Sequence, residues 1–364
     1  MIVAYVSSHG FGHATRTAAV LGTVRELRPD VAITVVSAAP ERLFRRAIPG
    51  ALVFRQLECD VGLVQKDALS IDEAATAARW KQFARDWPDL VDTEWRWLHH
   101  LGARVVLGDI PPLAFQAAHE VGVPSLALAN FSWDWIYKHL GKRQPTLREA
   151  ATRCAEAYAR AGLLLKLPFA GDLQAFPRVE DVPLVARVPN LTRDLVRQRL
   201  GLGAETVLLL SFGGFGLLGF DASVLARLGG LVFLTTEPLP APPPNVRVLD
   251  PVRLEAAGVE YQDLVGAADV VVTKPGYGIV SDAIGAGVRL IYTERGDFPE
   301  YNVIVSEMQR FLACVHVSRA DLLAGRLAEA VREVLAKNPP PRPDISGAEV
   351  VARRVLETVA RGGG

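Results

Sequence analysis

The distribution of apolar residues along the chain is the strongest structural signal in the sequence. Short runs rich in Val, Ile and Leu alternate with longer amphipathic stretches, which is typical of βαβ units in parallel sheets. In the first half we expect strands at residues 2–7, 32–37, 52–58, 104–109, 125–130 and 163–168. In the second half we expect strands at residues 206–213, 231–236, 246–250, 269–275, 289–294 and 313–317. The pattern predicts two successive doubly wound α/β sheets.

The domain boundaries follow from this duplication and from the length of the chain. A chain of 364 residues is longer than one hydrophobic core usually supports, so two domains are expected. We assign residues 1–180 to an N-terminal Rossmann-like domain and residues 181–191, where Pro and Val occur without helical period, to a linker. Residues 192–343 form the second Rossmann-like domain. Residues 344–364 contain a helical pattern that we expect to pack back across the linker.

Composition excludes several classes of protein. The chain has 40 Lys and Arg against 40 Asp and Glu, whereas nucleic-acid-binding proteins usually have a basic excess. Its three cysteines are far apart, so we expect neither a disulfide framework nor a zinc site, and we expect a reducing, cytoplasmic location. The N-terminus lacks the pattern of a signal peptide. No apolar run reaches the roughly 18 residues of a membrane span.

The first loop, "SSHGFGHATR", carries the most informative chemistry. Open α/β sheets bind ligands at the carboxyl ends of their strands, and this loop joins the first strand to the first helix. Gly10 and Gly12 permit a tight turn, while His9 and His13 add ionisable groups. A dinucleotide site is disfavoured, since Thr15 replaces the last glycine of that motif and no acidic residue ends the second strand. Packing or helix capping by the histidines remains an alternative.

Asp109 is the second candidate for catalysis. It ends an expected strand, immediately before a helix that begins with proline, so it can face the same edge of the sheet as the first loop. A carboxylate that accepts from one imidazole nitrogen leaves the other nitrogen able to take a proton from a hydroxyl. The alternative role of Asp109 is to cap the helix.

Several of these motifs resemble a known family. "GFGHATR", "GDIPPLAFQAA" and "VVTKPGYGIVSDAIGAG" resemble motifs of the GT-B glycosyltransferases that use UDP-sugars. "HGFGHATR", "QKDALSID", "NFSWDWIY" and "GYGIVSDAI" are similar to the glycosyltransferase-like N-terminal region of plant L-arabinokinases. The resemblance covers nearly the whole chain, and the sequence contains no kinase signature.

The resemblance implies an architecture and a reaction. Its members have two Rossmann-like domains that face each other across a cleft. The inverting members use a histidine after the first strand as general base and an aspartate that orients it, and these roles fall on His13 and Asp109. The implied co-substrate is a nucleotide-sugar, most readily a UDP-sugar, with no other cofactor. Because no D-x-D pair occurs, a diphosphate-bound metal ion is not implied.

The resemblance also implies donor-binding residues. They are Gly12, Ser211, Gly213, Gly214, Lys274, Gly276, Gly278, Asp282, Asp297 and Glu300. Phe215 departs from the family, because related enzymes often have Ser at this place and its hydroxyl contact is lost. Asp282 follows Gly278 by four residues, so its carboxylate can point back toward the ribose of a nucleotide held at the helix N-terminus. Ordinary βα turns and helix caps are the alternatives for these positions.

The acceptor is less well defined by the sequence. His9, Trp133 and Trp135 are candidates for acceptor contacts, since aromatic rings stack on sugar faces, although packing explains such rings equally well. The basic residues that follow, 138–143, would suit an anionic acceptor, a membrane surface or plain solvent. Two other functions stay open: a non-hydrolysing UDP-sugar epimerase and a non-catalytic module that binds sugar nucleotides.

Overall fold

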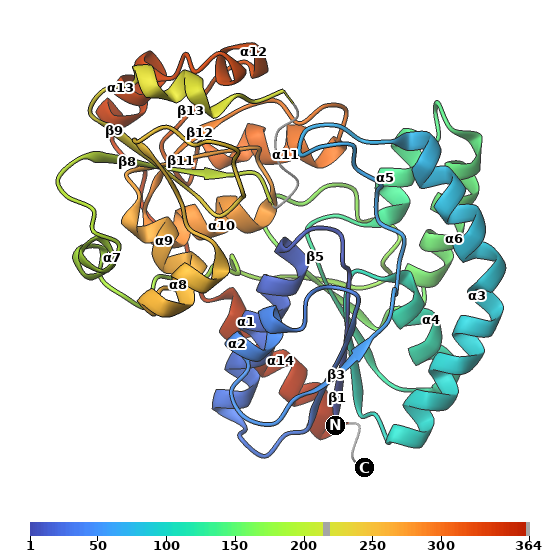
Figure 1. The fold of residues 1–364 in the computed structure, drawn as a ribbon. Coiled ribbons are helices and arrows are strands. Elements are labelled where there is room, and N and C mark those ends of the chain that lie inside the picture. Colours follow the sequence, from blue (N-terminus) through green and yellow to red (C-terminus); the bar gives the residue numbers. More distant parts are fainter. Residues whose placement is uncertain (214–218, 362–364) are drawn as a thin grey trace. The chain divides into compact units, whose positions relative to one another are not determined.

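The computed structural model describes residues 1–213 and 219–361 and divides the chain into two compact units (Figure 1). Unit 1 comprises Met1–Val64, Ile71–Val185 and Asp344–Gly364, and unit 2 comprises Gln65–Ser70 and Ala186–Pro343. The main boundary thus falls inside the stretch 181–191. That Gln65–Ser70 belongs to unit 2 was not expected from the sequence.

Unit 1 is built on a parallel sheet of seven strands. Their order across the sheet is β3-β2-β1-β4-β5-β6-β7, and every neighbouring pair is parallel. The strands are β1 (Ile2–Val6), β2 (Ile33–Ser37), β3 (Val53–Gln56), β4 (Val105–Asp109), β5 (Ser125–Ala129), β6 (Leu163–Lys166) and β7 (Val179–Asp181). The six strands expected in this half are confirmed; the short edge strand β7 was not expected, since its three residues form no apolar run.

Helices cover both faces of this sheet (Figure 1). One face carries α1 (Gly12–Leu27), α2 (Arg42–Ala47) and α14 (Gly347–Arg361). The other carries α3 (Glu73–Leu101), α4 (Pro112–Val121), α5 (Trp133–Leu140) and α6 (Pro145–Tyr158). The long α3 begins where Asp72 accepts a hydrogen bond from the Ala75 N–H and ends at left-handed Gly102. α14 packs against α1, which makes the end of the chain part of unit 1.

Unit 2 is built on a parallel sheet of six strands in the order β10-β9-β8-β11-β12-β13. They are β8 (Thr206–Ser211), β9 (Leu231–Thr235), β10 (Val246–Val248), β11 (Val270–Thr273), β12 (Arg289–Tyr292) and β13 (Cys314–His316). All six match strands that the sequence predicts. The reversal of strand order beside the first strand of each sheet is the doubly wound arrangement, which places loop residues at the carboxyl ends of the central strands.

The helices of unit 2 also lie on both faces of the sheet. They are α7 (Arg193–Arg199), the 3₁₀ helix η1 (Ala222–Arg227), α8 (Pro251–Ala257), α9 (Tyr261–Ala267), α10 (Tyr277–Ala286), α11 (Pro299–Met308), α12 (Arg319–Leu323) and α13 (Ala328–Ala336). α8, α9 and α10 lie on one side and α12 and α13 on the other (Figure 1). Ala68 and Leu69, from the segment Gln65–Ser70, are buried in the core that β8, β11 and α13 form.

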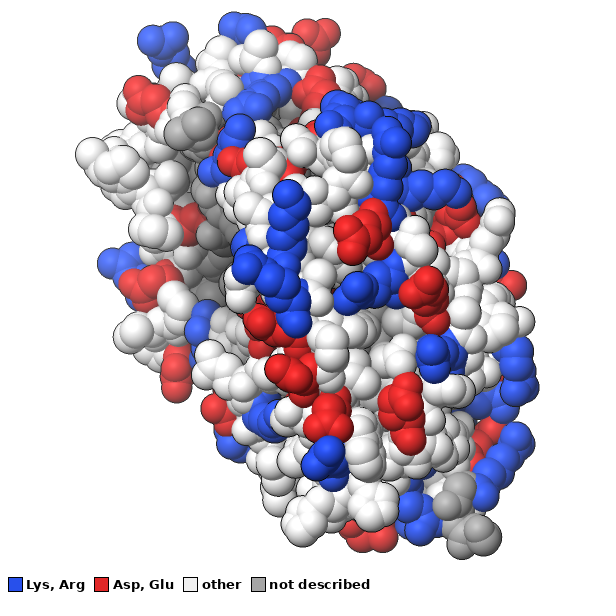
Figure 2. All heavy atoms as spheres, turned by 90° about the vertical axis from the view of Figure 1, so that its right-hand side faces the viewer, with Lys and Arg blue, Asp and Glu red and all other residues white. Residues whose placement is uncertain are grey.

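The face that Figure 2 shows carries charged side chains of both signs, with Asp and Glu scattered among Lys and Arg and several basic side chains gathered toward the upper right. Within residues 1–213 and 219–361, no helix combines the length and apolarity needed to cross a membrane.

Candidate functional site

The first group of candidate residues lies at the carboxyl edge of the unit 1 sheet. β1 and β4 are neighbours, with Val6 opposite Asp109, so the loop after β1 starts beside this aspartate. Gly10 has a φ of 72°, in the left-handed region that favours glycine, and this turn leads directly into α1. Gly12 and His13 are the first two residues of that helix. The turn therefore brings the His13 side chain back toward the end of β4.

His13 and Asp109 form a buried pair. The His13 Nδ1 lies 2.7 Å from Asp109 Oδ1, and the side chains are 6% and 0% exposed. Burial alone would raise the pKa of Asp109, but the charges of Arg16 and His13 lower it to about 2. An ionised carboxylate only accepts hydrogen bonds, so Nδ1 carries the proton and the acceptor of a neutral imidazole is Nε2. The geometry is that of an oriented general base, while its catalytic role stays a prediction.

Three further polar residues complete this cluster, and the sequence analysis did not assign them. Arg16 donates from Nε to Asp109 Oδ2 at 2.7 Å and from one terminal nitrogen to Oδ1 at 2.5 Å. Its other terminal nitrogen donates to the Asn130 side chain at 2.7 Å, and Thr17 donates to Asp109 Oδ2 at 2.6 Å. Arg16 follows His13 by three residues, so both lie on one face of α1. That spacing is the signal that could have revealed it.

Asp60 is a second buried carboxylate near this pair. Burial raises its pKa, although hydrogen bonds from Ser7 and Trp133 and the charge of His13 act against the rise. The Trp133 Nε1 donates to Asp60 at 2.7 Å. Asp60 was not predicted from the sequence because it follows a short edge strand and belongs to no recognisable motif.

The acceptor candidates have mainly packing roles in this structure. Trp133 is fully buried and its ring stacks on Tyr137, so it presents no face to a sugar. Trp135 is half-buried and lies against Gly171, where a Cβ would come within 2.1 Å of its ring. His9 is half-buried, accepts from the Leu63 N–H at 3.3 Å and contacts the edge of Trp133. The expectation of sugar stacking on Trp133 is therefore replaced by packing.

The second group lies at the carboxyl edge of the unit 2 sheet, after β8, β11 and β12. The Ser211 hydroxyl is 2.5 Å from the Tyr261 hydroxyl, so the end of β8 is tied to the start of α9. Gly213 follows with a φ of 77°. Gly214 and Phe215, which the sequence analysis singled out, lie outside the described residues.

The loop after β11 supplies Lys274 and the start of α10. Gly276 caps this helix and Gly278 lies in its first turn, and the backbone N–H groups of that turn have no acceptors within the helix. Lys274 is buried, and burial together with the charge of Arg295 lowers its pKa to about 7. The positive charge that the sequence analysis gave to Lys274 is therefore only partly present at neutral pH.

The loop after β12 carries the remaining donor candidates. Glu300 and Arg295 form an ion pair at 2.9 Å, and their side chains are 4% and 11% exposed. The Arg295 guanidinium also lies 4.0 Å from the ring centre of Phe298. Asp297 is exposed. The structure thus brings Glu300, Arg295 and Lys274 to one edge of unit 2.

Asp282 has other partners than the ribose that the sequence analysis assigned to it. Its side chain, 4% exposed, forms an ion pair with Arg187 and accepts the Arg187 Nε at 3.2 Å. Arg187 in turn lies over the ring of Tyr261, 5.8 Å from its centre. The Asp282 carboxylate faces the segment around Arg187 because α10 packs closely against it. This packing requires a glycine at position 285, since a Cβ there would clash with the Arg187 carbonyl. Asp282 is therefore a structural ion-pair partner in this structure.

A hairpin from the first half of the sequence approaches the same edge of unit 2. The Lys66 N–H donates to Ser70 O at 3.0 Å and closes the hairpin. Asp67 at its tip accepts from Arg319 at 3.0 Å. The Leu69 carbonyl lies 2.8 Å from where a Cβ on Gly296 would be, so this glycine permits the close approach. No local pattern in the sequence predicted that this hairpin joins the second sheet.

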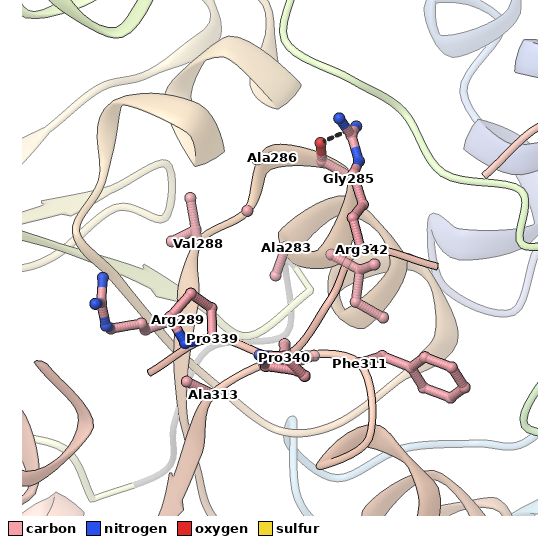
Figure 3. Close-up of a pocket in the computed structure, with 13 residues that line it drawn as sticks. Ala283, Gly285, Ala286, Val288, Arg289, Phe311, Ala313, Pro339, Pro340 and Arg342 are labelled. Carbon is pink, nitrogen blue, oxygen red and sulfur yellow. Dashed lines mark hydrogen bonds between the residues drawn. The ribbon is translucent and has the colours of Figure 1, made fainter. Parts of the chain in front are cut away.

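A pocket of about 130 Å³ lies elsewhere in unit 2 (Figure 3). It is lined by the end of α10, the start of β12, the segment just before β13, and Pro340 and Arg342. Arg342 points toward the Gly285 carbonyl and donates to it at 2.6 Å. Because these are the amino ends of the strands, the pocket is not part of either candidate group.

One curated protein is similar to this chain in sequence. No family model matches the chain. An L-arabinokinase of Arabidopsis thaliana is 32% identical over 361 residues, which cover 97% of this chain and 34% of that protein. The chain thus spans about a third of the length of this relative.

Solved structures match the chain over nearly its full length. The calicheamicin glycosyltransferase CalG4 has a TM-score of 0.58 at 18% identity, covering 100% of this chain and 95% of that one. Arabidopsis thaliana UGT89C1 in complex with UDP has a TM-score of 0.60 at 15% identity, covering 99% of both chains. A Listeria monocytogenes protein described as a UDP-N-acetylglucosamine 2-epimerase has a TM-score of 0.60 at 10% identity, covering 98% and 94%. The chain therefore has the GT-B fold, with two doubly wound parallel sheets, and in sequence it is similar to part of an L-arabinokinase.

Proposed function

We propose that the protein is an inverting glycosyltransferase that moves a sugar from a UDP-sugar to a hydroxyl group of an acceptor. The observation that carries this proposal is the buried pair of His13, which comes after β1, and ionised Asp109, which ends the neighbouring strand β4. Such a pair leaves Nε2 as the basic atom. Within residues 1–213 and 219–361, Nε2 of His13 has no hydrogen-bond partner.

The proposed reaction is a single displacement at the anomeric carbon. The acceptor oxygen forms a bond to this carbon while its proton passes to His13 Nε2. The bond from the same carbon to the β-phosphate oxygen breaks, and its electron pair leaves with UDP. Attack and departure occur on opposite sides, so the configuration inverts. Asp109 accepts from Nδ1 throughout and stabilises the imidazolium that forms.

For the donor we propose a site at the carboxyl edge of the unit 2 sheet. The N–H groups at the start of α10 and the side chain of Lys274 would face the diphosphate, because helix N-termini and cations stabilise such anions. Glu300 is the candidate for contacts to sugar hydroxyls. These groups would stabilise the leaving UDP without a bound metal ion.

The binding of UDP is expected to weaken as the pH rises above 7. The pKa of Lys274 is lowered to about 7 by burial and by Arg295, so the free protein loses this charge above that pH. A bound diphosphate favours the charged form and raises the pKa, so binding takes up a proton and affinity falls by up to about tenfold per pH unit. Calorimetric titration of UDP at pH 6.5 and 8.5, in two buffers with different ionisation heats, measures both effects. Lys274→Arg should bind with little pH dependence. Equal proton uptake in this variant and the wild type would contradict the assignment.

Binding and product analysis together test the proposed function. A nucleotide that binds at about 100 times its Kd stabilises the protein by about 2.7 kcal/mol, so a thermal-shift screen of nucleoside diphosphates and their sugars should select UDP compounds. UDP-sugars that stabilise the chain are then incubated with and without mixed hydroxyl acceptors and with EDTA. We expect an acceptor-dependent, EDTA-insensitive product of inverted configuration. An altered sugar nucleotide without acceptor would instead indicate an epimerase, and binding without turnover a non-catalytic module.

A further inference from the structure

Arg16 is bound directly to Asp109 of the His13–Asp109 pair. Its side chain is 4% exposed. Two of its nitrogens donate to the two oxygens of Asp109, at 2.5 and 2.7 Å, which is the bidentate geometry of strong Arg–carboxylate pairs. The third donates to Asn130 at 2.7 Å, so the guanidinium plane is fixed on both sides.

The same guanidinium also lies next to the imidazole. One terminal nitrogen of Arg16 is 3.1 Å from His13 Nδ1, and both groups are hydrogen-bonded to the same oxygen, Asp109 Oδ1. The negative charge of Asp109 is thus shared between a permanent cation and a histidine that is charged only when it binds a second proton. Phe131, which contacts the ring edge to face, contributes no charge.

The charges around His13 determine how strongly Asp109 favours the protonated imidazole. Among the described residues, the charged and titratable groups near the imidazole include Arg16 on α1, Asp109 on β4 and Asp60 after β3. Asp60 is buried, and burial raises the pKa of its carboxyl group, while the charge of His13 acts against the rise. Without Arg16, the negative charge of Asp109 would stabilise the imidazolium in full. With Arg16 present, the positive guanidinium offsets that negative charge, so the stabilisation is smaller.

We propose that Arg16 is a positioning residue whose positive charge offsets the negative charge that Asp109 exerts on His13. Asp109 then still orients the imidazole, but the imidazole stays unprotonated to lower pH. A base needs Nε2 unprotonated before the reaction, and a bare His–Asp pair in a buried site favours the imidazolium. The catalytic meaning of this balance rests on the proposed function. The electrostatic effect on His13 does not.

Histidine NMR titration of the ligand-free protein measures the effect directly, with His13→Ala used to assign the signal. In Arg16→Gln, the pH at which half of the His13 side chains carry a second proton should rise by about one unit or more, and one unit is about 1.4 kcal/mol. Arg16→Lys keeps the charge near Asp109 and should stay within about half a unit of the wild type, even if its geometry is less ideal. A residue with only a structural role would give the same midpoint in both variants.

The double variant keeps the test valid if Arg16→Gln does not fold. Asp109→Asn should lower the His13 midpoint, because Arg16 is then an uncompensated cation, and Arg16→Gln with Asp109→Asn should raise it again toward the wild-type value. Equal midpoints in Asp109→Asn and the double variant would overturn the proposal. If sugar transfer is found, the acidic limb of its pH profile should follow the Arg16→Gln shift. If no transfer is found but the midpoints move as described, the proposed function fails and the role of Arg16 stands.

Discussion

Replacing His13 with alanine is expected to lower the rate of sugar transfer by about 10²- to 10⁴-fold, the usual contribution of a general base. The affinity for UDP should stay nearly unchanged, since proton transfer stabilises only the transition state. Single-turnover rates with a saturating UDP-sugar, together with calorimetric titration of UDP, separate the two quantities. The structural basis is the 2.7 Å contact that fixes the ring against Asp109.

His9→Ala is the matched control for this result. His9 lies in the same loop, where its Nδ1 accepts from the Leu63 N–H and its ring contacts Trp133, so its loss should cost far less activity. Asp109→Asn should lower transfer less than His13→Ala, because the base remains but its tautomer and orientation are no longer fixed. Full turnover by His13→Ala with a true acceptor would refute the assignment of the base.

Asp282→Asn is expected to destabilise the protein by about 3 to 5 kcal/mol, the typical cost of removing one partner of a buried ion pair. Asp282 is 4% exposed and balances Arg187, whose guanidinium would keep its charge without a counter-ion. Burial tends to lower the pKa of Arg187, but the charge of Asp282 more than offsets this and raises it. Denaturant unfolding, with unit 2 followed through a probe in that unit, measures the loss.

Glu333→Gln is the matched control in the same unit. Glu333 pairs with Lys337 on the surface, where the side chains are 54% and 42% exposed, and such pairs contribute about 0 to 1 kcal/mol. UDP titration of Asp282→Asn at a temperature where it is folded tests the ribose contact expected from the sequence. If Asp282→Asn kept the wild-type free energy of unfolding but lost much of its affinity for UDP, Asp282 would be a donor-binding residue and the structural role would be contradicted.

Much of the architecture could be predicted because it depends on local patterns. A buried parallel strand is a short apolar run, and a helix repeats its apolar face every three to four residues, so the alternation predicted twelve strands that the structure contains. Glycine at a turn with positive φ is equally local, as at Gly10. The strand β7 was missed because three residues at a sheet edge need no apolar run.

The candidate site was predictable only where a strand end or a helix start marked it. His13 comes after β1 and Asp109 ends β4, and parallel strands share one carboxyl edge, so their proximity followed from the order of the elements. Whether they act as predicted awaits the His13→Ala experiment. The partners of the other residues had no such marker: Arg16 and Asp109 are 93 residues apart, and Arg187 and Asp282 are 95 apart.

The sequence by itself determined the two doubly wound sheets and the glycine turns, and it singled out His13 and Asp109 as the pair predicted to form an oriented base. Only the tertiary structure decided that Arg16 balances Asp109, that Asp282 pairs with Arg187, that Trp133 is buried and that the hairpin Gln65–Ser70 joins unit 2. The physical reason is that periodicity reports which face of an element is buried, whereas the choice of partner for a buried charge depends on which distant side chain packing brings within hydrogen-bond distance.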